Sequence, residues 1–305
     1  MKVAVYHPNF KPTKIAQVVA AGFQAHGHET KCRSLERTVS GTFGIFAAGD
    51  EDLAVIVDRK DAYAFSFFKT IKKPFIYIGQ AYCRDGNWRR VVFNDVHPTK
   101  YVGKLNCPSD RFEQSGWEVH PWRIRTDDFG EVEGNRYGHI VYAADDPNNA
   151  RWQQSPTWRL FTEHLIKDIR VYSKRPVVFR PNPKHLHVPD KMPGYIMESV
   201  GQYPLKKSIK DAHCLIVVDS SACVTALLMG IPTIVLGNAV TRNICSTTLT
   251  HLEYPYKAYP DQRMSLLSDL AYCQWHLEEI SSGYMWNTYE RFLLERIHDV
   301  TARHS

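Results

Sequence analysis

The 305-residue sequence predicts an α/β protein made of two Rossmann-like, doubly wound domains. Short apolar, β-branched segments alternate twice with helical patterns, which is typical of parallel sheets covered by helices. Hydrophobic residues make up 44% and charged residues 23%, so the composition is globular. The length is about twice that of an ordinary domain. We therefore expect a first domain over 1–135, a second over 136–285, and a C-terminal helix at about 286–305 that packs back on the first.

The first alternation opens with a strand and a helix. Lys2–Tyr6 is apolar and β-branched, Thr13–Ala25 has apolar positions at helical spacing, and Gly27 stands where a helix C-cap belongs. The remaining elements expected in this half are parallel strands at 53–57, 75–78 and 90–93 and a helix at 61–72. The Asp-, Glu- and Gly-rich stretch 123–136 lacks periodicity and is interpreted as the inter-domain link.

The second alternation begins at His139. Its expected strands are 139–143, 176–179, 214–218 and 232–236, and its expected helices are 157–170, 204–212 and 222–229. Two helical segments follow the last strand, at about 262–280 and 286–301. Because they come too late to continue the alternation, we expect this tail to cross back onto the first domain.

Composition excludes several classes of protein. No apolar run approaches the span of about 20 residues that a bilayer requires, and the N-terminus lacks the pattern of a signal peptide. We therefore expect a cytoplasmic protein, located in the host cytoplasm if a phage encodes it. The seven cysteines are scattered without a C-x-x-C motif and are interpreted as reduced thiols.

Charge is distributed unevenly along the chain. Residues 1–125 carry 19 Lys and Arg against 12 Asp and Glu, whereas residues 126–305 carry 19 against 20. A basic first part suggests a polyanionic or phosphate-bearing partner, although solvated lysines explain such a surplus equally well.

Polar residues follow the expected strands of the second half, where ligands of open parallel sheets bind. Ser220 and Ser221 stand at the start of a helix, where unpaired backbone N–H groups attract a phosphate. The alternative is that one serine merely caps the helix. Arg180 and Lys184 follow a neighbouring strand and could supply cations to the same crevice, although the flanking prolines could simply stiffen that loop.

These residues carry a resemblance. The segment Asp219–Gly237 resembles the donor-site segment of GT-B-type glycosyltransferases, and Phe179–Lys184 resembles the Arg/His-Pro-x-Pro element of capsule-type sugar transferases. The run Leu270–Trp286 is similar to glycosyltransferase-like proteins of phages and bacteria, some of them associated with modified DNA bases. The resemblance covers residues 139–290 well and residues 1–125 weakly.

The resemblance implies two domains facing a cleft, a nucleotide-sugar co-substrate with UDP-sugar favoured, and neither a tightly bound cofactor nor a metal. No GxGxxG and no P-loop motif occurs, which argues against a dinucleotide oxidoreductase or a P-loop NTPase. The residues that the resemblance assigns to donor binding are Arg180, Lys184, Ser220, Ser221, Ala222, Asn238, Arg242, Ser246 and Thr247.

The first domain is then expected to hold the acceptor and a general base. An attacking hydroxyl loses its proton as the bond forms, which a carboxylate or a neutral imidazole can accept. The catalytic candidates at the expected strand ends are Asp95, His97 and His7. Asp95 and His97 also lie in turn-like sequence, so an ordinary loop is the alternative.

A mixture of arginines and aromatics follows the third expected strand. Arg84, Trp88, Arg89 and Arg90 suit a DNA surface, where cations hold phosphates and rings stack on bases. They equally suit a strand edge with arginine lying over tryptophan. The leading hypothesis is a glycosyltransferase acting on a 5-hydroxymethylated pyrimidine in DNA. The alternatives are a capsule or lipopolysaccharide glycan transferase, a nucleotide-sugar 2-epimerase, and a binding module without catalysis; the oligomeric state is not indicated.

Overall fold

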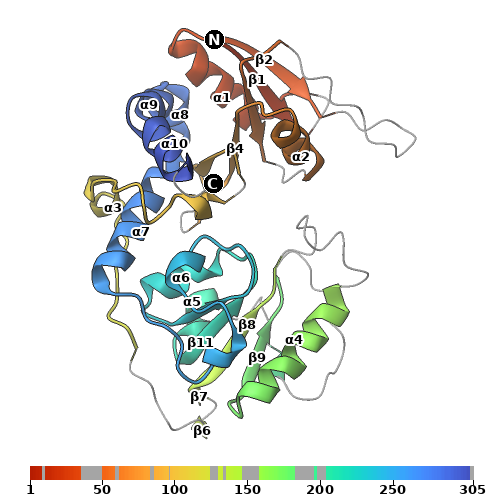
Figure 1. Ribbon diagram of the computed structural model, residues 1–305, viewed down its shortest axis with the longest axis vertical. Helices are drawn as coiled ribbons and strands as arrows, with labels where there is room; N and C mark the ends of the chain where they lie inside the picture. The colour runs from red at the N-terminus through yellow and green to blue at the C-terminus, as the bar shows by residue number, and fades with distance from the viewer. Residues whose placement is uncertain are drawn as a thin grey trace. The chain divides into compact units, whose positions relative to one another are not determined.

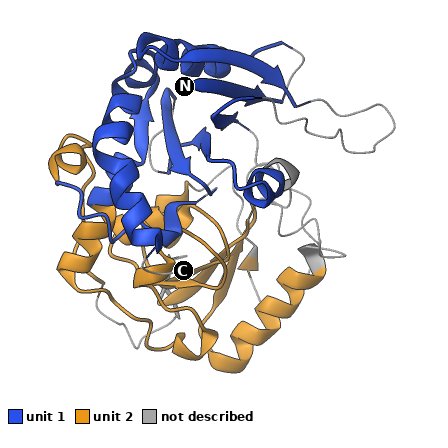
Figure 2. Cartoon of the chain, turned by 45° about the horizontal axis from the view of Figure 1, so that its top comes forward, with its two compact units in different colours: residues 1–108, 268–305 blue, residues 109–267 orange. Residues whose placement is uncertain are grey.

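The computed structural model divides the chain into two compact units, shown in Figures 1 and 2. Unit 1 contains residues 1–108 and 268–305, and unit 2 contains residues 109–267. The structure describes residues 1–8, 11–35, 50–58, 62–82, 86–95, 97–123, 130–132, 135–145, 158–182, 196–197 and 204–302. Among the described helices, none combines the length and apolar character needed to cross a bilayer.

Unit 1 is built on a six-stranded sheet in the order β13-β5-β4-β3-β1-β2. Its strands are β1 (Lys2–His7), β2 (Glu29–Ser34), β3 (Leu53–Val57), β4 (Phe75–Gln80), β5 (Trp88–Phe93) and β13 (Gln274–His276). Strands β1 to β4 pair in parallel, and their order is that of a doubly wound, flavodoxin-like sheet. The sheet order changes direction between β1 and β3, so these two strands form the switch point of unit 1.

Strand β5 runs antiparallel to β4, so the expectation that it is parallel is wrong. A parallel neighbour requires a crossover of a dozen or more residues, and the connection between β4 and β5 is only residues 81–87. The short, Gly86-containing connection was the signal in the sequence. As a consequence, the C-terminal end of β5 lies beside the N-terminal ends of β1, β3 and β4, on the opposite side of the sheet from their C-terminal ends.

The core of unit 1 is rich in aromatic side chains. Tyr6, Phe65, Phe68, Phe75 and Tyr77 are buried together between the sheet and α2 (Ala62–Thr70). Helix α1 (Lys14–Ala25) begins at a capping Thr13, whose hydroxyl accepts the N–H of Ala16 at 3.2 Å. A Cβ on Gly22 would lie 1.8 Å from the carbonyl oxygen of Ile280, so this glycine allows the C-terminal segment to pack directly on α1.

The C-terminal segment returns to unit 1, as predicted, and it does so from residue 268. Its elements are α7 (Pro260–Tyr272), which begins in unit 2, then β13, α8 (Leu277–Ser281), α9 (Tyr284–Thr288), a π-helical turn (Tyr289–Leu293) and α10 (Leu294–Ala302). The helix expected over 262–280 is therefore wrong from Gln274 to His276. These residues pair with the edge of β5 and bury Trp275, which outweighs their helical spacing.

A buried carboxylate fixes the start of this return. Asp269 is fully buried, and its oxygens accept the backbone N–H groups of Gly103, Leu105 and Cys107 at 2.7, 2.9 and 2.8 Å. Charge-assisted hydrogen bonds of this kind are about twice as strong as neutral ones. Asp269 thereby joins the two sequence segments of unit 1, close to the positions 108/109 and 267/268 at which the chain passes between the units.

Unit 2 contains a five-stranded parallel sheet in the order β10-β9-β8-β11-β12. Its strands are β8 (His139–Ala143), β9 (Val177–Arg180), β10 (Ile196–Met197), β11 (Ala212–Val217) and β12 (Thr233–Val235). Numbered along the chain the order is 3-2-1-4-5, the Rossmann arrangement with its switch point between β8 and β11. Helices α4 (Trp158–Tyr172), α5 (Leu205–Ile209) and α6 (Ala222–Leu228) connect these strands.

The core of unit 2 follows from strands that are apolar on both faces. All described positions of β8, β9, β11 and β12 are buried, as expected for parallel strands covered by helices on each side. Gly230, at φ +69°, ends α6 where a Cβ would lie 1.9 Å from the carbonyl oxygen of Pro121. Together the two Rossmann-like units and the returning C-terminal segment confirm the predicted fold class.

The segment expected as the inter-domain link contains a short hairpin. Strands β6 (Gly130–Val132) and β7 (Asn135–Tyr137) pair antiparallel, within unit 2. The units divide at 108/109 and 267/268, whereas the sequence placed the domain boundaries at 135/136 and about 285/286. The short helix α3 (Asp110–Glu113) therefore belongs to unit 2.

Candidate functional site

The switch point of the unit 2 sheet is held together by a carboxylate. Asp145 follows β8 and Asp219 follows β11, and both are buried. The Oδ2 atom of Asp145 accepts the backbone N–H of Asp219 at 2.9 Å. The loops that leave the two strands are thus joined directly where an open α/β sheet binds its ligand.

Asp219 extends this connection to a third loop. Its Oδ1 atom accepts the backbone N–H of Asn238, which follows β12. Three neighbouring strand ends are therefore connected through two aspartates that were absent from the expected donor set. Each aspartate is the second residue after a strand whose positions are all buried, and this pattern was visible in the sequence.

The serine pair lies beside these aspartates. Ser221 is the N-cap of α6 and is exposed, and its side chain makes no capping hydrogen bond. The hydroxyl of Ser220 accepts the N–H of Ala222 at 3.3 Å. Local capping is therefore provided by Ser220, while Ser221 is exposed at the start of the helix.

Arg180 occupies the end of β9 and is 7% exposed. Its Nη1 atom donates to the hydroxyl of Ser208, on α5, at 2.8 Å. A guanidinium is thus held at this strand end in part by the hydroxyl of Ser208. Lys184, the second expected cation, lies outside the described residues.

Of the donor candidates that follow β12, two stabilise the local loop through hydrogen bonds and two are exposed. Arg242 donates from Nη1 to the carbonyl oxygens of Gly237 and Val235 at 2.5 and 3.3 Å, and so stabilises the turn after β12. Ser246 is buried, and its hydroxyl accepts the N–H of Tyr256 at 2.8 Å. Asn238 and Thr247 are exposed.

In unit 1 the three catalytic candidates do not lie at one place. His7 ends β1, at the switch point of the sheet, and is 1% exposed. Asp95 lies beyond β5, at the opposite edge, where its carboxylate is 3.7 Å from the ammonium of Lys69. The neighbouring Asn94 accepts the N–H of Phe75, at the start of β4, which fixes this turn to that edge.

His97 belongs to a buried cluster with Arg90, Tyr77 and Tyr82. The Arg90 guanidinium carbon lies 5.2 and 5.1 Å from the ring centres of Tyr77 and Tyr82. Nδ1 of His97 is 3.0 Å from the Tyr82 hydroxyl and 3.4 Å from Nη1 of Arg90. Because a guanidinium only donates, Nδ1 accepts, and the proton of the neutral imidazole is on Nε2.

The expected DNA-binding residues are less exposed than the sequence suggested. Arg90 is 5% exposed and its guanidinium lies over the rings of Tyr77 and Tyr82, so it is a core residue and not part of an exposed cationic surface. Arg89 is partly buried and donates to the carbonyl oxygens of Gly86 and Trp88 at 2.6 and 2.8 Å. Trp88 packs against the ring of His276 at 5.5 Å between centres, and Arg84 lies outside the described residues.

Comparison with known proteins gives a result only at the level of structure. No profile of a known family matches the chain, and no curated protein matches its sequence. KpsC of Thermosulfurimonas dismutans, a beta Kdo 2,7 transferase, is similar with a TM-score of 0.50 and 14% identity, over 95% of this chain and 100% of that one. This similarity confirms the predicted GT-B-like fold.

Two further solved structures match with lower scores. A beta Kdo 2,4 transferase, also KpsC of Thermosulfurimonas dismutans, has a TM-score of 0.47 at 10% identity and covers 89% of each chain. The glycosyltransferase SnogD of Streptomyces nogalater has a TM-score of 0.30 at 11% identity, over 95% of this chain and 98% of that one.

Proposed function

We propose that this chain is a glycosyltransferase that moves a sugar from a nucleotide-sugar, with a UDP-sugar favoured, onto an acceptor hydroxyl. The observation that carries the proposal is the switch point of unit 2, where Asp145 and Asp219 join three strand-end loops. Ligands of open α/β sheets bind at such points. The fold shared with a beta Kdo 2,7 transferase favours group transfer among the reactions that such sheets support.

Six of the nine expected donor residues then have a role. The backbone N–H groups of Ser220, Ser221 and Ala222 would bind the diphosphate, as backbone donors at helix starts do, with that of Ala222 exchanging its bond to the Ser220 hydroxyl. Arg180 would offset the negative charge that grows on the departing diphosphate, so its contribution is greatest in the transition state. Arg242 and Ser246 would act indirectly by shaping the loop after β12.

On the acceptor side, we assign the general base to His7. It alone among the three candidates lies at the switch point of the unit 1 sheet. His97, with its proton on Nε2, would donate a hydrogen bond instead of accepting a proton. Asp95, at the opposite edge and paired with Lys69, would have no part in the chemistry.

The first acceptor candidate is a 5-hydroxymethylated pyrimidine in DNA, supported by the basic balance of residues 1–125. The second is a capsule or lipopolysaccharide glycan. It is favoured by the burial of Arg90, which removes one cation from the expected DNA surface, and by the fold shared with a Kdo transferase.

One experiment decides between these reactions. The full chain is incubated with a panel of nucleotide-sugars and either DNA containing 5-hydroxymethylated bases or a lipopolysaccharide or capsule acceptor, and products are identified by mass spectrometry. Transfer to either acceptor supports the proposal. Interconversion of the nucleotide-sugar without acceptor would identify a 2-epimerase, and donor binding without turnover would identify a binding module.

A salt titration tests the DNA acceptor separately. If phosphates are bound, the logarithm of DNA affinity falls linearly with the logarithm of salt concentration, and Arg89→Ala lowers that slope by about 0.9. Lys206→Ala, an exposed position on α5 of unit 2, is the matched control. Binding without salt dependence, or equal slopes for both variants, would reject DNA in favour of the glycan.

A further inference from the structure

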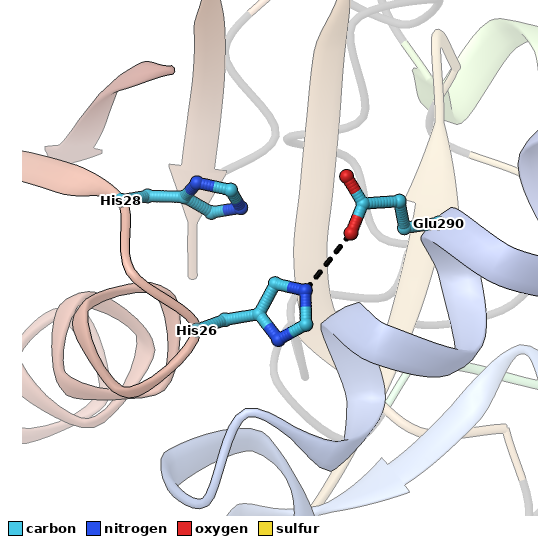
Figure 3. Close-up of side chains that lie close together, drawn as sticks. All are labelled: His26, His28 and Glu290. Carbon is cyan, nitrogen blue, oxygen red and sulfur yellow. Dashed lines mark hydrogen bonds and ion pairs between the residues drawn. The ribbon is translucent and has the colours of Figure 1, made fainter.

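Three side chains that commonly ligate metals lie together in unit 1, at the opposite end of its strands from the switch point of its sheet. They are His26, His28 and Glu290, and their ligand atoms all lie within 4.8 Å of one another. Nε2 of His26 is 2.8 Å from Oε2 of Glu290. Figure 3 shows the three side chains around a common space, with one ring nitrogen of His28 on the side that faces the Glu290 carboxylate. The cluster joins residues 264 positions apart in the sequence.

The backbone places the two histidines in a fixed turn. His26 is the C-cap of α1, and the N–H groups of His26 and His28 both donate to the carbonyl oxygen of Phe23, at 3.2 and 3.0 Å. Gly27, between them, has φ +81° and donates to the carbonyl of Gln24 at 2.9 Å. Such a glycine-centred helix end is a rigid arrangement, so two imidazoles are oriented before any ligand binds.

Aromatic packing fixes the His28 ring. Trp286, on α9, lies edge-on to it with ring centres 5.8 Å apart, and Phe23 lies 6.1 Å away on α1. Glu290 itself stands in the π-helical turn, a local widening of the helix that is often found at functional sites.

One ring nitrogen in this cluster lacks a partner. Nε2 of His28 is buried and has no hydrogen-bond partner among the described residues. A buried polar atom left in this state costs stability unless a ligand satisfies it. A metal ion would use the lone pair on this nitrogen, together with those of His26 and Glu290.

From this geometry we propose that His26, His28 and Glu290 bind a divalent transition-metal ion, with zinc the ion that fits best. Two imidazoles and one carboxylate are a common zinc donor set, whereas Mg²⁺ and Ca²⁺ prefer oxygen ligands. Ligand atoms around tetrahedral zinc are about 3.3 Å apart, so small side-chain rotations would close the observed spacing. The Glu290 side chain is 48% exposed, which provides an entry path and room for a water as fourth ligand.

The bound ion would connect the turn after α1 to the returning C-terminal segment. Both belong to unit 1 and are already in contact through Gly22 and Ile280. The site is separate from the residues assigned to transfer, so its presence does not depend on the proposed function. Its role is to fasten the last part of the chain to the first.

The test uses the untagged full chain, freed of metal with a chelator and titrated with Zn²⁺ by calorimetry. We expect one Zn²⁺ per chain and a rise in the thermal unfolding temperature on binding. His28→Ala and the conservative Glu290→Gln should each weaken Zn²⁺ binding by roughly 100-fold or more, since changes even to residues that only support the ligands cost 10–100-fold. Co²⁺ should give visible absorption bands in the wild-type chain and lose them in both variants.

Two exposed residues of α10 provide matched controls. His298→Ala and Glu295→Gln alter the same residue types in the same segment, and both should bind Zn²⁺ as the wild type does. Circular dichroism of the metal-free chains establishes that each variant is folded. The proposal is overturned if folded Glu290→Gln binds Zn²⁺ as tightly as the wild type, or if the control variants lose binding equally.

Discussion

The two units are built on related doubly wound sheets, but the buried acidic side chains next to their strands have different partners. In unit 2, Asp145 and Asp219 accept backbone N–H groups of neighbouring loops and so shape the strand ends. In unit 1, Glu51 accepts from side chains instead: the Tyr6 hydroxyl at 2.9 Å and the Lys73 ammonium at 3.3 Å. Asp145 and Asp219 thus connect the loops after the unit 2 strands, whereas Glu51 neutralises a lysine within unit 1, where the backbone-holding carboxylate is Asp269.

The two sheets also differ in where the polar residues that follow their strands lie. All five strands of the unit 2 sheet are parallel, so the residues that follow them meet at one edge. The antiparallel β5 of unit 1 divides its polar residues between two edges, with His7 at one and Asp95 at the other. A shared architecture therefore does not give equal sites.

The largest expected effect tests the placement of His7 and Asp95 on opposite sides of the unit 1 sheet. If transfer activity is established, His7→Gln should lower turnover by about 10²–10⁴-fold, the usual contribution of a general base. Asp95→Asn should leave turnover within about a factor of 3, a change of roughly 0.6 kcal/mol in the activation barrier. Steady-state kinetics at saturating donor measures both. The reverse result would place the acceptor at the other edge of the sheet.

The next prediction concerns the carboxylate that connects the two segments of unit 1. Asp269→Ala leaves three backbone N–H groups without their buried acceptor. We expect a loss of about 3 kcal/mol or more in the free energy of unfolding, measured by urea denaturation, because each buried donor left unsatisfied costs about 1–3 kcal/mol. Asp299→Ala, at an exposed position of α10, should change it by less than about 0.5 kcal/mol. Equal losses would show that Asp269 does not hold the return in place.

A third prediction probes the cation at the unit 2 strand ends. Arg180→Ala should raise the donor KM and lower turnover by about 10²–10³-fold, as removal of a donor that stabilises transition-state charge does. Lys206→Ala removes an exposed cation of the same unit and should change neither constant. If folded Arg180→Ala retained wild-type kinetics, Arg180 would be only a partner of Ser208.

The smallest expected effect concerns Glu51, the buried carboxylate of unit 1 that accepts from side chains. Burial acts to raise the pKa of Glu51, but its backbone hydrogen bond, the Tyr6 hydroxyl and Lys73 together hold the pKa below its ordinary value. This stabilisation is present above the ordinary glutamate pKa and is lost as the pH falls through the lower, folded-state pKa. Glu51→Gln should therefore cost about 1.5–3 kcal/mol at pH 7 and progressively less below about pH 4.

Unfolding by urea at several pH values measures this effect. Asp52→Asn, next to Glu51 in the chain and exposed, is the matched control, and its asparagine keeps an oxygen that can accept the N–H of Lys2. A constant difference between Glu51→Gln and the wild type from pH 7 to pH 3 would contradict the assigned pKa shift.

Much of the fold could be predicted from local sequence. The strands 53–57 and 139–143 have the expected bounds, because fully buried parallel strands appear as short continuous apolar runs. Strand β13 could not be predicted in this way. Its residues become a strand only because the edge of β5 accepts them, and local spacing carries no record of that distant pairing.

The candidate site shows the same limit. Residues directly after buried strands were visible in the sequence, and Asp145 and Asp219 could have been selected by that rule. The cluster of His26, His28 and Glu290 could not, because the short spacing of the histidines says nothing about which later segment approaches them. Long-range packing decides that, and the resemblance seen in the sequence implied no metal.

The discontinuity of unit 1 affects how the chain is made. During synthesis on the ribosome, the edge of β5 emerges long before β13, with roughly 180 residues between them. At about 5–20 residues per second, this strand edge would wait about 10–40 s for its partner. An unpaired strand edge invites pairing with other chains. Unit 2 can complete its sheet first, so the nascent first half would depend on chaperones, or on its aromatic core alone, until the last 40 or so residues arrive.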